Sequence, residues 1–358
     1  MAKPQFPFEP WEALLRQDPG SRGVSNFRHE GKWLAPGAWK SAAESLAAGT
    51  GAVAIVTGFA VPLGEQVVGE TDGPPGALFL ARALLELGRE VWLISDEYGR
   101  PLLECGCDLW QLGRDKILTF PFDSAHPQAV ERHSYAVQDS PQSLAWVASF
   151  FADGPGGKLS HLISVERAGP SHTLDSFLAQ PRQQTAPLAQ FEQEIAANSR
   201  NVCHNMRGTP INQWTAKTHL LWDHIQHHNL PIVTLGIGDG GNELGMGSLP
   251  WEVLCRAIRQ GPAGRIACRV AASHCVLAGV SNWGAYALAL AVCALTHQLP
   301  LAAAWSCAEQ QALIDELVQQ TGAIDGVTCQ HSATVDGLTS AVYASVLGGL
   351  RQSLGFSP

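Results

Sequence analysis

Strand-like runs alternate along this chain with helical segments of about 10–15 residues, and this alternation most constrains the fold. Residues 52–57 (AVAIVT) form an unbroken apolar run, which is typical of a strand covered on both faces. Because strands joined through helices pair in parallel, we predict an α/β fold with a mainly parallel, doubly wound (Rossmann-like) sheet and helices on both faces. Further strands are predicted at residues 91–95, 117–122, 161–165, 232–237, 269–272 and 302–305.

The segments between these strands have apolar spacing suited to helices. We predict helices at residues 9–17, 41–48, 77–87, 144–151, 188–205, 216–227, 283–295 and 308–320. No internal repeat or low-complexity linker divides the sequence, so we predict one catalytic α/β domain over residues 1–358. Residues 1–50 are expected to form a helical extension packed on this domain. A domain boundary near residues 153–157 (DGPGG) stays open as an alternative.

Composition favours a globular protein that binds a small anion and argues against nucleic acid. Hydrophobic residues make up 46% of the chain and charged residues 15%, which is far from a disordered composition. The net charge is −9 and no run of Lys or Arg occurs, whereas binding nucleic acid needs a basic field. A small anionic metabolite needs only one or two well-placed cations or a metal. A homo-oligomer stays open.

Cysteine usage and hydropathy predict a soluble, cytoplasmic protein that does not bind membranes. The nine cysteines are scattered and form no C-x-x-C, so we expect buried, reduced thiols and no disulfide framework or zinc ribbon. Residues 1–11 contain no apolar stretch that would suggest a signal peptide. The most apolar segment, residues 275–296, is interrupted by SNWG and is interpreted as a strand, a loop and a buried helix.

The first of two acidic, glycine-rich loops covers residues 69–77 (GETDGPPGA) and leads into a predicted helix. It carries Glu70 and Asp72 with Thr71 between them. Two prolines stiffen the loop and three glycines allow it to turn. We interpret it as a rigid carrier of oxygen ligands. An acidic cap at the N-terminus of the following helix is the alternative.

The second loop, residues 236–247 (GIGDGGNELGMG), follows a predicted strand. Its glycines match the dinucleotide pattern G-x-G-x-x-G, but Asp239 and Glu243 would place like charge beside a pyrophosphate. Both loops lie beyond the carboxyl ends of strands, where open parallel sheets bind ligands. We therefore predict that this loop binds a metal or a ligand, with a purely structural turn as the alternative.

The carboxylates of the two loops predict a divalent cation. Carboxylate and amide oxygens with no His or Cys nearby select Mg²⁺ or Mn²⁺ over Zn²⁺. A rival cluster, His224, His227 and His228, lacks the glutamate of a zinc motif and is expected to be a solvated helix face. The predicted metal ligands are Glu70, Asp72, Asp239 and Glu243.

Three further segments carry polar side chains at predicted strand or helix ends. Glu166 and Arg167 follow a strand and are either part of the site or a structural salt bridge. Arg207 follows a predicted helix and suits a bidentate grip on a carboxylate. Ser281 and Asn282 join a strand to a buried helix, which they could simply cap.

Six motifs of this sequence resemble the C-terminal domain of D-glutamate cyclase and its stand-alone prokaryotic relatives. In the family's order they are TGF at 57–59, ETDGPPGA at 70–77, ERAG at 166–169, NMRG at 205–208, GIGDGGNELGMG at 236–247 and SNWGAYAL at 281–288. Weaker support comes from RGV at 22–24 and VDGL at 335–338. Together these motifs span nearly the whole chain, and the two glycine-rich strings are too long to match by chance.

The resemblance implies a lyase that removes water from D-glutamate and closes it to 5-oxo-D-proline. Under this hypothesis Glu166 is the base, Arg207 grips the α-carboxylate, and Asp72 is a catalytic metal ligand. Mn²⁺ or Mg²⁺ would act as a Lewis acid on the side-chain carboxylate. The residues expected to bind substrate are Thr57, Gly58, Thr71, Asn205, Gly240, Asn242, Ser281 and Asn282.

Two other functions stay open at this point. The same site could serve a divalent-metal-dependent phosphohydrolase acting on a small phosphate ester, with water as the nucleophile. Alternatively, the protein could bind a metabolite without turning it over. Release of phosphate from simple esters would indicate the first function, and tight binding without turnover would indicate the second.

Overall fold

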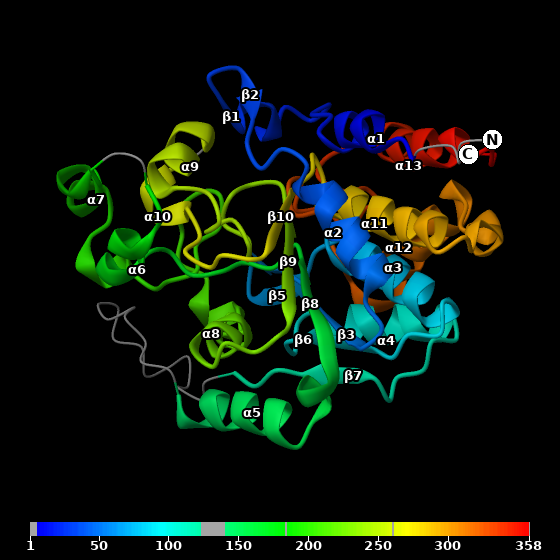
Figure 1. Ribbon diagram of the computed structural model, residues 1–358, viewed down its shortest axis with the longest axis horizontal. Helices are drawn as coiled ribbons and strands as arrows, with labels where there is room; N and C mark the ends of the chain where they lie inside the picture. The colour runs from blue at the N-terminus through cyan, green and yellow to red at the C-terminus, as the bar shows by residue number, and fades with distance from the viewer. Residues whose placement is uncertain (1–5, 123–139, 183–184, 260, 358) are drawn as a thin grey trace.

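The central element of the computed structural model is a six-stranded parallel sheet (Figure 1). The structure describes residues 6–122, 140–182, 185–259 and 261–357. The strands lie in the order β10-β9-β8-β3-β6-β7, which is the 3-2-1-4-5-6 order of doubly wound folds and confirms the predicted α/β class. Their bounds are β3 (Ala52–Thr57), β6 (Val91–Ser95), β7 (Ile117–Thr119), β8 (Leu159–Val165), β9 (Val233–Gly238) and β10 (His274–Leu277).

Strand β3 shows why the sheet needs cover on both faces. All six of its side chains are buried. Val53 and Ile55 belong to one hydrophobic core, whereas Ala54 and Val56, which point the opposite way, belong to a second core. Burial of each Val or Ile side chain stabilises the fold by about 1.5–3 kcal/mol. A continuous apolar run therefore becomes a central strand between two layers of helices.

The first layer holds the longer helices, which Figure 1 shows on one side of the sheet. The predicted N-terminal extension belongs to this layer: α2 packs against α11 and β10, and α1 lies beside α13, where Trp11 Nε1 donates a hydrogen bond of 2.7 Å to Ser353 Oγ. The helices of this layer are α1 (Phe8–Leu15), α2 (Ala38–Ala48), α3 (Pro74–Glu86), α4 (Arg100–Leu109), α11 (Ser281–Leu295), α12 (Cys307–Thr321) and α13 (Ser340–Ser353).

The second layer is made of mostly shorter helices and long connections on the opposite side of the sheet (Figure 1). Its helices are α5 (Pro141–Ala152), α6 (Leu174–Ala179), α7 (Leu188–Glu194), α8 (Leu220–His227), α9 (Trp251–Ala257) and α10 (Ala263–Ile266). Two small antiparallel hairpins complete the strands: β1 (Arg28–His29) with β2 (Lys32–Trp33), and β4 (Ala60–Leu63) with β5 (Gln66–Gly69).

Short 3₁₀ turns connect several of these elements, and one of them replaces a predicted strand. We predicted a strand at residues 302–305, but these residues lie in and just after the turn η5 (Leu299–Ala304), which has Pro300 in its first turn. The prediction of a strand there was wrong because those apolar residues follow α11 as a tight turn. The other 3₁₀ turns are η1 (Val24–Asn26), η2 (Pro155–Lys158), η3 (Ala197–Ser199) and η4 (Asn212–Trp214).

Two more predicted elements were wrong, and the sequence analysis missed five helices. Residues 269–272 form isolated bridges with other loops, and the edge strand of the sheet is β10 instead. The helix predicted over 188–205 stops at Glu194, because the later residues pair with the segment after β8, as in the hydrogen bond from Ser171 N to Val202 O. Helices α4, α6, α9, α10 and α13 were not predicted.

Three global features bear on the other predictions. Strand β3 pairs with β8, so one sheet joins the two sides of residues 153–157. All nine cysteines are free thiols, which confirms that no disulfide framework is present. Among the described helices none has the length and apolar character to cross a membrane.

Candidate active site

The two acidic loops meet at the carboxyl end of the sheet, where the strand order reverses between β3 and β8. Thr57 ends β3, and Glu166 follows β8. Gly73 lies against both: a Cβ atom added to it would be 2.8 Å from Thr57 Oγ1 and 2.9 Å from Glu166 Cβ. Its φ of 99° also favours glycine. Open parallel sheets bind ligands at this crevice, and here it is lined by carboxylates.

Helices α3 and α11 begin side by side at this crevice and cap each other. Asp72 accepts hydrogen bonds from the backbone N–H groups of Ser281 and Asn282, both at 3.0 Å, at the start of α11. In return, Asn282 Oδ1 accepts from the N–H groups of Gly73 at 3.0 Å and Gly76 at 2.7 Å, at the start of α3. Asp72 and Asn282 therefore do cap helices, as the alternative interpretation held, and this capping is compatible with the functional roles predicted for them. The caps hold Asp72 rigidly in place.

The second loop is closed by its own glutamate. Glu243 is fully buried, and its two carboxylate oxygens accept from the backbone N–H groups of Asp239 at 3.2 Å, Gly240 at 2.7 Å and Gly241 at 2.7 Å. These bonds bend the chain so that the side chain of Asp239 faces the first loop. Glu243 thus positions the loop whether or not it also contacts a ligand.

Two residues that the site prediction omitted complete the acidic cluster. Asp336 lies in the loop before α13, and its Oδ1 accepts a hydrogen bond of 2.7 Å from Arg22 Nη1. Arg22 Nη2 lies 3.7 Å from Asp239 Oδ2. The weaker RGV and VDGL motifs carried the signal for these two residues. Arg22 is therefore the guanidinium that the described structure places on the acidic cluster.

Burial and mutual repulsion raise the pKa values of these carboxyl groups. Burial raises the pKa of Asp72 to about 8, with a further contribution from Asp336. Burial first, and then neighbouring carboxylates, also hold the pKa values of Glu70 and Glu166 well above their ordinary range. The same cause raises the pKa of Asp239 and Asp336, while Arg22 acts in the opposite direction. So many buried acids in one place require protons or a cation to balance their charge.

The carboxylate oxygens are close enough to share one ion. Within the described residues, two groups of three carboxylates have one oxygen each within 4.8 Å of one another. The first is Asp72, Asp239 and Asp336, and the second is Glu166, Asp239 and Glu243. Glu70, in the first loop, lies against Gly326: a Cβ atom added to Gly326 would clash with Glu70 Oε2.

Glu166 is held in a strained conformation at the end of β8. Its φ is 45°, in the left-handed region that non-glycine residues rarely adopt. Its Oε2 accepts a hydrogen bond of 2.6 Å from Ser281 Oγ. The neighbouring Arg167 does not form the salt bridge considered for this pair; it contacts Asp96 at 2.6 Å and Gly58 O at 2.7 Å. Glu166 is thus left to face the cluster.

Arg207 does not contact these carboxylates. It is exposed, and no ion pair found among the described residues includes it. Its loop is tightened by Asn205 Oδ1, which accepts from the N–H groups of Arg207 and Thr209, both at 3.0 Å. The loop does approach the site, because a Cβ atom on Gly240 would be 2.8 Å from Met206 Sδ.

The remaining predicted binding residues mostly use their polar atoms within the fold. Thr71 Oγ1 donates to Thr334 O at 2.7 Å, and Asn242 Nδ2 donates to His204 O at 2.9 Å. Thr57 differs, because its Oγ1 is buried and has no hydrogen-bond partner in the described structure.

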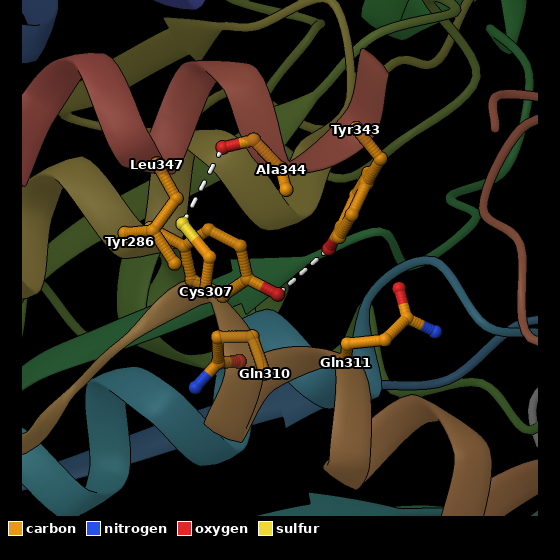
Figure 2. Close-up of a pocket in the computed structure, with 7 residues that line it drawn as sticks. All are labelled: Tyr286, Cys307, Gln310, Gln311, Tyr343, Ala344 and Leu347. Carbon is orange, nitrogen blue, oxygen red and sulfur yellow. Dashed lines mark hydrogen bonds between the residues drawn. The ribbon is translucent and has the colours of Figure 1, made fainter. Parts of the chain in front are cut away.

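A second polar group lies where α11 meets α12 and α13. The hydroxyl groups of Tyr286 and Tyr343 are 2.7 Å apart and border a cavity of about 10 Å³ (Figure 2). This volume suits one water molecule. Gln310 lines the same cavity, and its buried amide atoms have no partner among the described residues. The cavity is too small for a metabolite, so it supports the capped helix ends and is not the substrate site.

The predicted solvated histidine cluster stands apart from the acidic site. His224 stacks on Phe151, with ring centroids 4.6 Å apart, and lies 4.2 Å from His228. Neither group of potential metal ligands in the described structure contains these histidines.

The strand order and the buried carboxylates at the reversal point define a doubly wound α/β protein with an acidic crevice site. More particularly, the chain belongs to the family described as D-glutamate cyclase-like, C-terminal, which matches residues 11–351. It is similar to the mitochondrial D-glutamate cyclase of Homo sapiens, with 30% identity over 286 residues. The match covers 78% of this chain and 38% of the relative, so the chain spans less than two fifths of the relative's length. The family resemblance is thereby confirmed.

Proposed function

We propose that this protein closes D-glutamate, or a similar small amino-dicarboxylate, to 5-oxo-D-proline with loss of water. The observation that carries the proposal is the convergence of buried carboxylates at the strand-order reversal of a chain in this family. The name of the human relative supports the choice of substrate. The enzyme class would be a hydro-lyase assisted by Mn²⁺ or Mg²⁺. The cytoplasmic location and a homo-oligomeric state stay predictions.

The reaction forms one C–N bond and breaks one C–O bond. The α-nitrogen attacks the carbon of the side-chain carboxyl group, and one oxygen of that group leaves as water. Both hydrogens of this water come from the ammonium group, so a nearby group must take protons from nitrogen and deliver them to oxygen. Holding the substrate folded contributes about 7–11 kcal/mol toward the barrier of such a ring closure.

Glu166 is the residue we assign to proton transfer. Its pKa is raised mainly by burial and further by Asp239, which makes it both a stronger base and a carboxyl group able to return a proton. Ser281 Oγ orients the carboxylate at 2.6 Å. General acid–base catalysis of this kind contributes on the order of 10²–10⁴-fold.

The proposed cation would be held by the carboxylates of the two loops. Of the four predicted ligands, Asp72, Asp239 and Glu243 belong to the two groups of close carboxylates, and Glu70 lies beside them. Glu243 also accepts hydrogen bonds from three backbone N–H groups. Oxygen donors without nearby His or Cys fit Mn²⁺ or Mg²⁺. When bound, the cation would polarise the side-chain carboxylate of the substrate.

The substrate's α-carboxylate needs a separate cation. We retain Arg207 for this role, because its exposed guanidinium lies on the loop that packs against Gly240. Arg22 sits directly on the cluster and is the second candidate. Replacing Arg22 should lower the free energy of unfolding, whereas replacing the exposed Arg207 should change it little.

The decisive experiment follows D-glutamate, L-glutamate and a panel of phosphate esters by mass spectrometry with Mn²⁺ or Mg²⁺. We expect a product lighter by one water from D-glutamate and slower conversion of L-glutamate, whose amine would point away from the side-chain carboxylate. Glu166→Gln should abolish turnover, while Asp115→Asn, at an exposed acid, should not. Water loss from neither enantiomer would reject the cyclase, phosphate release would support a phosphohydrolase, and binding alone would support a metabolite-binding protein.

A further inference from the structure

We propose that Asp336 completes a three-aspartate cation site with Asp72 and Asp239, so that the loop before α13 belongs to the site together with the two glycine-rich loops. The inference deepens the proposed function and rests on it for the choice of cation, but not for turnover. Asp336 was not among the ligands predicted from the sequence.

The geometry of the three side chains suits a single ion. One carboxylate oxygen from each lies within 4.8 Å of the other two. Oxygens that surround Mn²⁺ or Mg²⁺ at about 2.1 Å are separated by about 3 Å when adjacent and about 4 Å when opposite. The three aspartates come from segments far apart in the chain, after β5, after β9 and before α13, so that no local turn explains their meeting.

Unfilled hydrogen-bonding capacity marks the same place. Within the described residues, Asp239 Oδ2 and Asp336 Oδ2 are buried without a hydrogen-bond partner, and Asp239 Oδ2 has an ion-pair contact of 3.7 Å with Arg22 Nη2. Independently, Thr57 Oγ1 is fully buried at the crevice and has no hydrogen-bond partner among the same residues; a Cβ atom on Gly73 would lie 2.8 Å from it. Buried polar groups are almost always paired, with protein, water or an ion. Three buried oxygens without a hydrogen bond at one crevice therefore point to a bound species.

Neighbouring acids show what a structural carboxylate looks like in this protein. Asp325 is fully buried, and its Oδ1 accepts from the N–H groups of Val327 and Thr328 at 2.9 and 3.0 Å. Its Oδ2 accepts from Thr334 Oγ1 and Gly337 N, both at 2.7 Å. These bonds fix the loop that presents Asp336, whose φ is 57°. Asp325 thus shapes the loop, while the outer oxygen of Asp336 is left for a ligand.

The charges also favour a divalent cation at this point. Arg22 bridges Asp336 at 2.7 Å and Asp239 at 3.7 Å, and so supplies one positive charge to the group. When ionised, the three aspartates and the adjacent Glu70 and Glu166 would carry more negative charge than this one guanidinium compensates. A divalent ion among the aspartates would compensate the remainder.

The test measures Mn²⁺ binding to the purified full chain by calorimetry and counts the metal-bound waters by water-proton relaxation. Asp336→Asn is expected to weaken binding at least about 10-fold, because a neutral amide oxygen replaces a charged carboxylate. Asp336→Gly, which removes the ligand, is expected to admit one additional metal-bound water. Both variants should fold, because asparagine and glycine tolerate a left-handed φ. Asp115→Asn is the control for a lost negative charge and should leave both measurements unchanged.

Each outcome decides the inference. Unchanged affinity in Asp336→Asn, or no additional metal-bound water in Asp336→Gly, would overturn Asp336 as a ligand. No Mn²⁺ binding by the wild-type protein would also overturn it. If Mn²⁺ binds through Asp336 but D-glutamate is not converted, the proposed function fails while the three-aspartate site stands.

Discussion

At the level of single residues, the charge balance of the site depends on a guanidinium from the start of the chain. Arg22 is held by Asp18, whose Oδ1 accepts from the Arg22 backbone N–H at 2.7 Å, and its side chain spans Asp336 and Asp239. Burial lowers the pKa of an arginine, but these carboxylates outweigh that effect and raise the pKa of Arg22. Arg22 therefore stays charged and stabilises the acids around it.

Replacing Arg22 tests this balance. Arg22→Gln should lower the free energy of unfolding of the metal-free protein by about 1–3 kcal/mol, because buried carboxylates lose their counter-ion. Mn²⁺ should then stabilise the variant more than the wild-type protein, since the cation no longer meets a neighbouring positive charge. Denaturant unfolding with and without Mn²⁺ measures both effects, with Arg256→Gln as the exposed control. Equal stabilisation of both proteins by Mn²⁺ would contradict the prediction.

Arg207 should behave differently because it is exposed. Arg207→Met is expected to raise KM for D-glutamate by about 10-fold or more, with a change in stability within about 0.5 kcal/mol. Steady-state kinetics and thermal unfolding of the same samples give the comparison. Arg256→Met serves as the matched surface variant. An unchanged KM would remove Arg207 from substrate binding and leave Arg22 as the candidate.

At the level of elements, the site depends on how closely its loops pack. A Cβ atom on Gly236 of β9 would lie 2.1 Å from Leu244 O and 2.5 Å from Gly245 Cα, and Gly245 itself has a φ of 103°. The glycines of the second loop therefore let it fold back on the strand that leads into it. Close packing therefore explains some glycines of this loop, and the proposed ligand site explains others.

A pair of glycine substitutions tests the packing of β9 against its loop. Gly236→Ala should destabilise the protein by at least about 3 kcal/mol, because the added methyl group meets backbone that cannot move aside. Gly349→Ala in α13 meets only Leu14 side-chain atoms at 3.5 and 3.6 Å and should stabilise by about 0.5–1 kcal/mol. Urea unfolding of both variants gives the comparison. A neutral Gly236→Ala would show that the loop does not return to β9 in this way.

At the level of the whole molecule, the doubly wound order brings every site segment to one end of the sheet. Strands β3 and β8 are neighbours, and the chain proceeds outward from them in opposite directions. The crevice between the two halves receives loops from both. The first helical layer then adds the loops that carry Arg22 and Asp336. Folding of the whole chain is thus needed before the acidic cluster exists.

His161 in β8 should contribute a loss of stability under mildly acidic conditions, whereas the buried acids of the site, whose pKa values are raised, act in the opposite direction. Burial, and next the charge of Arg89, lower the pKa of His161 to about 4, while its ring contacts Ser45 Oγ at 3.1 Å and Ser160 Oγ at 2.9 Å. The unfolded chain binds the proton more readily, so stability is complete above about pH 6.5 and falls as the pH drops toward 4. The loss from this residue amounts to about 3 kcal/mol.

Denaturant unfolding of wild type and His161→Gln between pH 4.5 and 7.5 measures this contribution. The difference in unfolding free energy between the two proteins should shrink as the pH falls, because only the wild type must keep the imidazole of residue 161 neutral, while both proteins retain the buried His172 and His204. His29→Asn, at an exposed position, should parallel the wild type. A constant difference across this range would exclude His161 as a source of acid sensitivity.

Local pattern was enough to predict much of the fold. The apolar run of β3, the turns rich in glycine and proline, and the alternation of strands and helices each reflect interactions within about a dozen residues. Two of the failures share one cause. The predicted helix over 188–205 was overridden by pairing with the segment after β8, and the apolar residues at 269–272 were used in isolated bridges instead of a sheet.

The candidate ligands on the glycine-rich loops could likewise be named from sequence, because acidic residues among glycines and prolines after a strand are a local signal. Their partners could not. Asp336 and Arg22 are 314 residues apart, and nothing near either residue indicates that the other will accept or donate its hydrogen bond. The exposure of Arg207 and the capping of α11 by Asp72 are likewise set by packing between distant segments. The sequence determines the chemistry of each side chain. Which charged side chains face one another depends on strand order and helix packing over the whole chain.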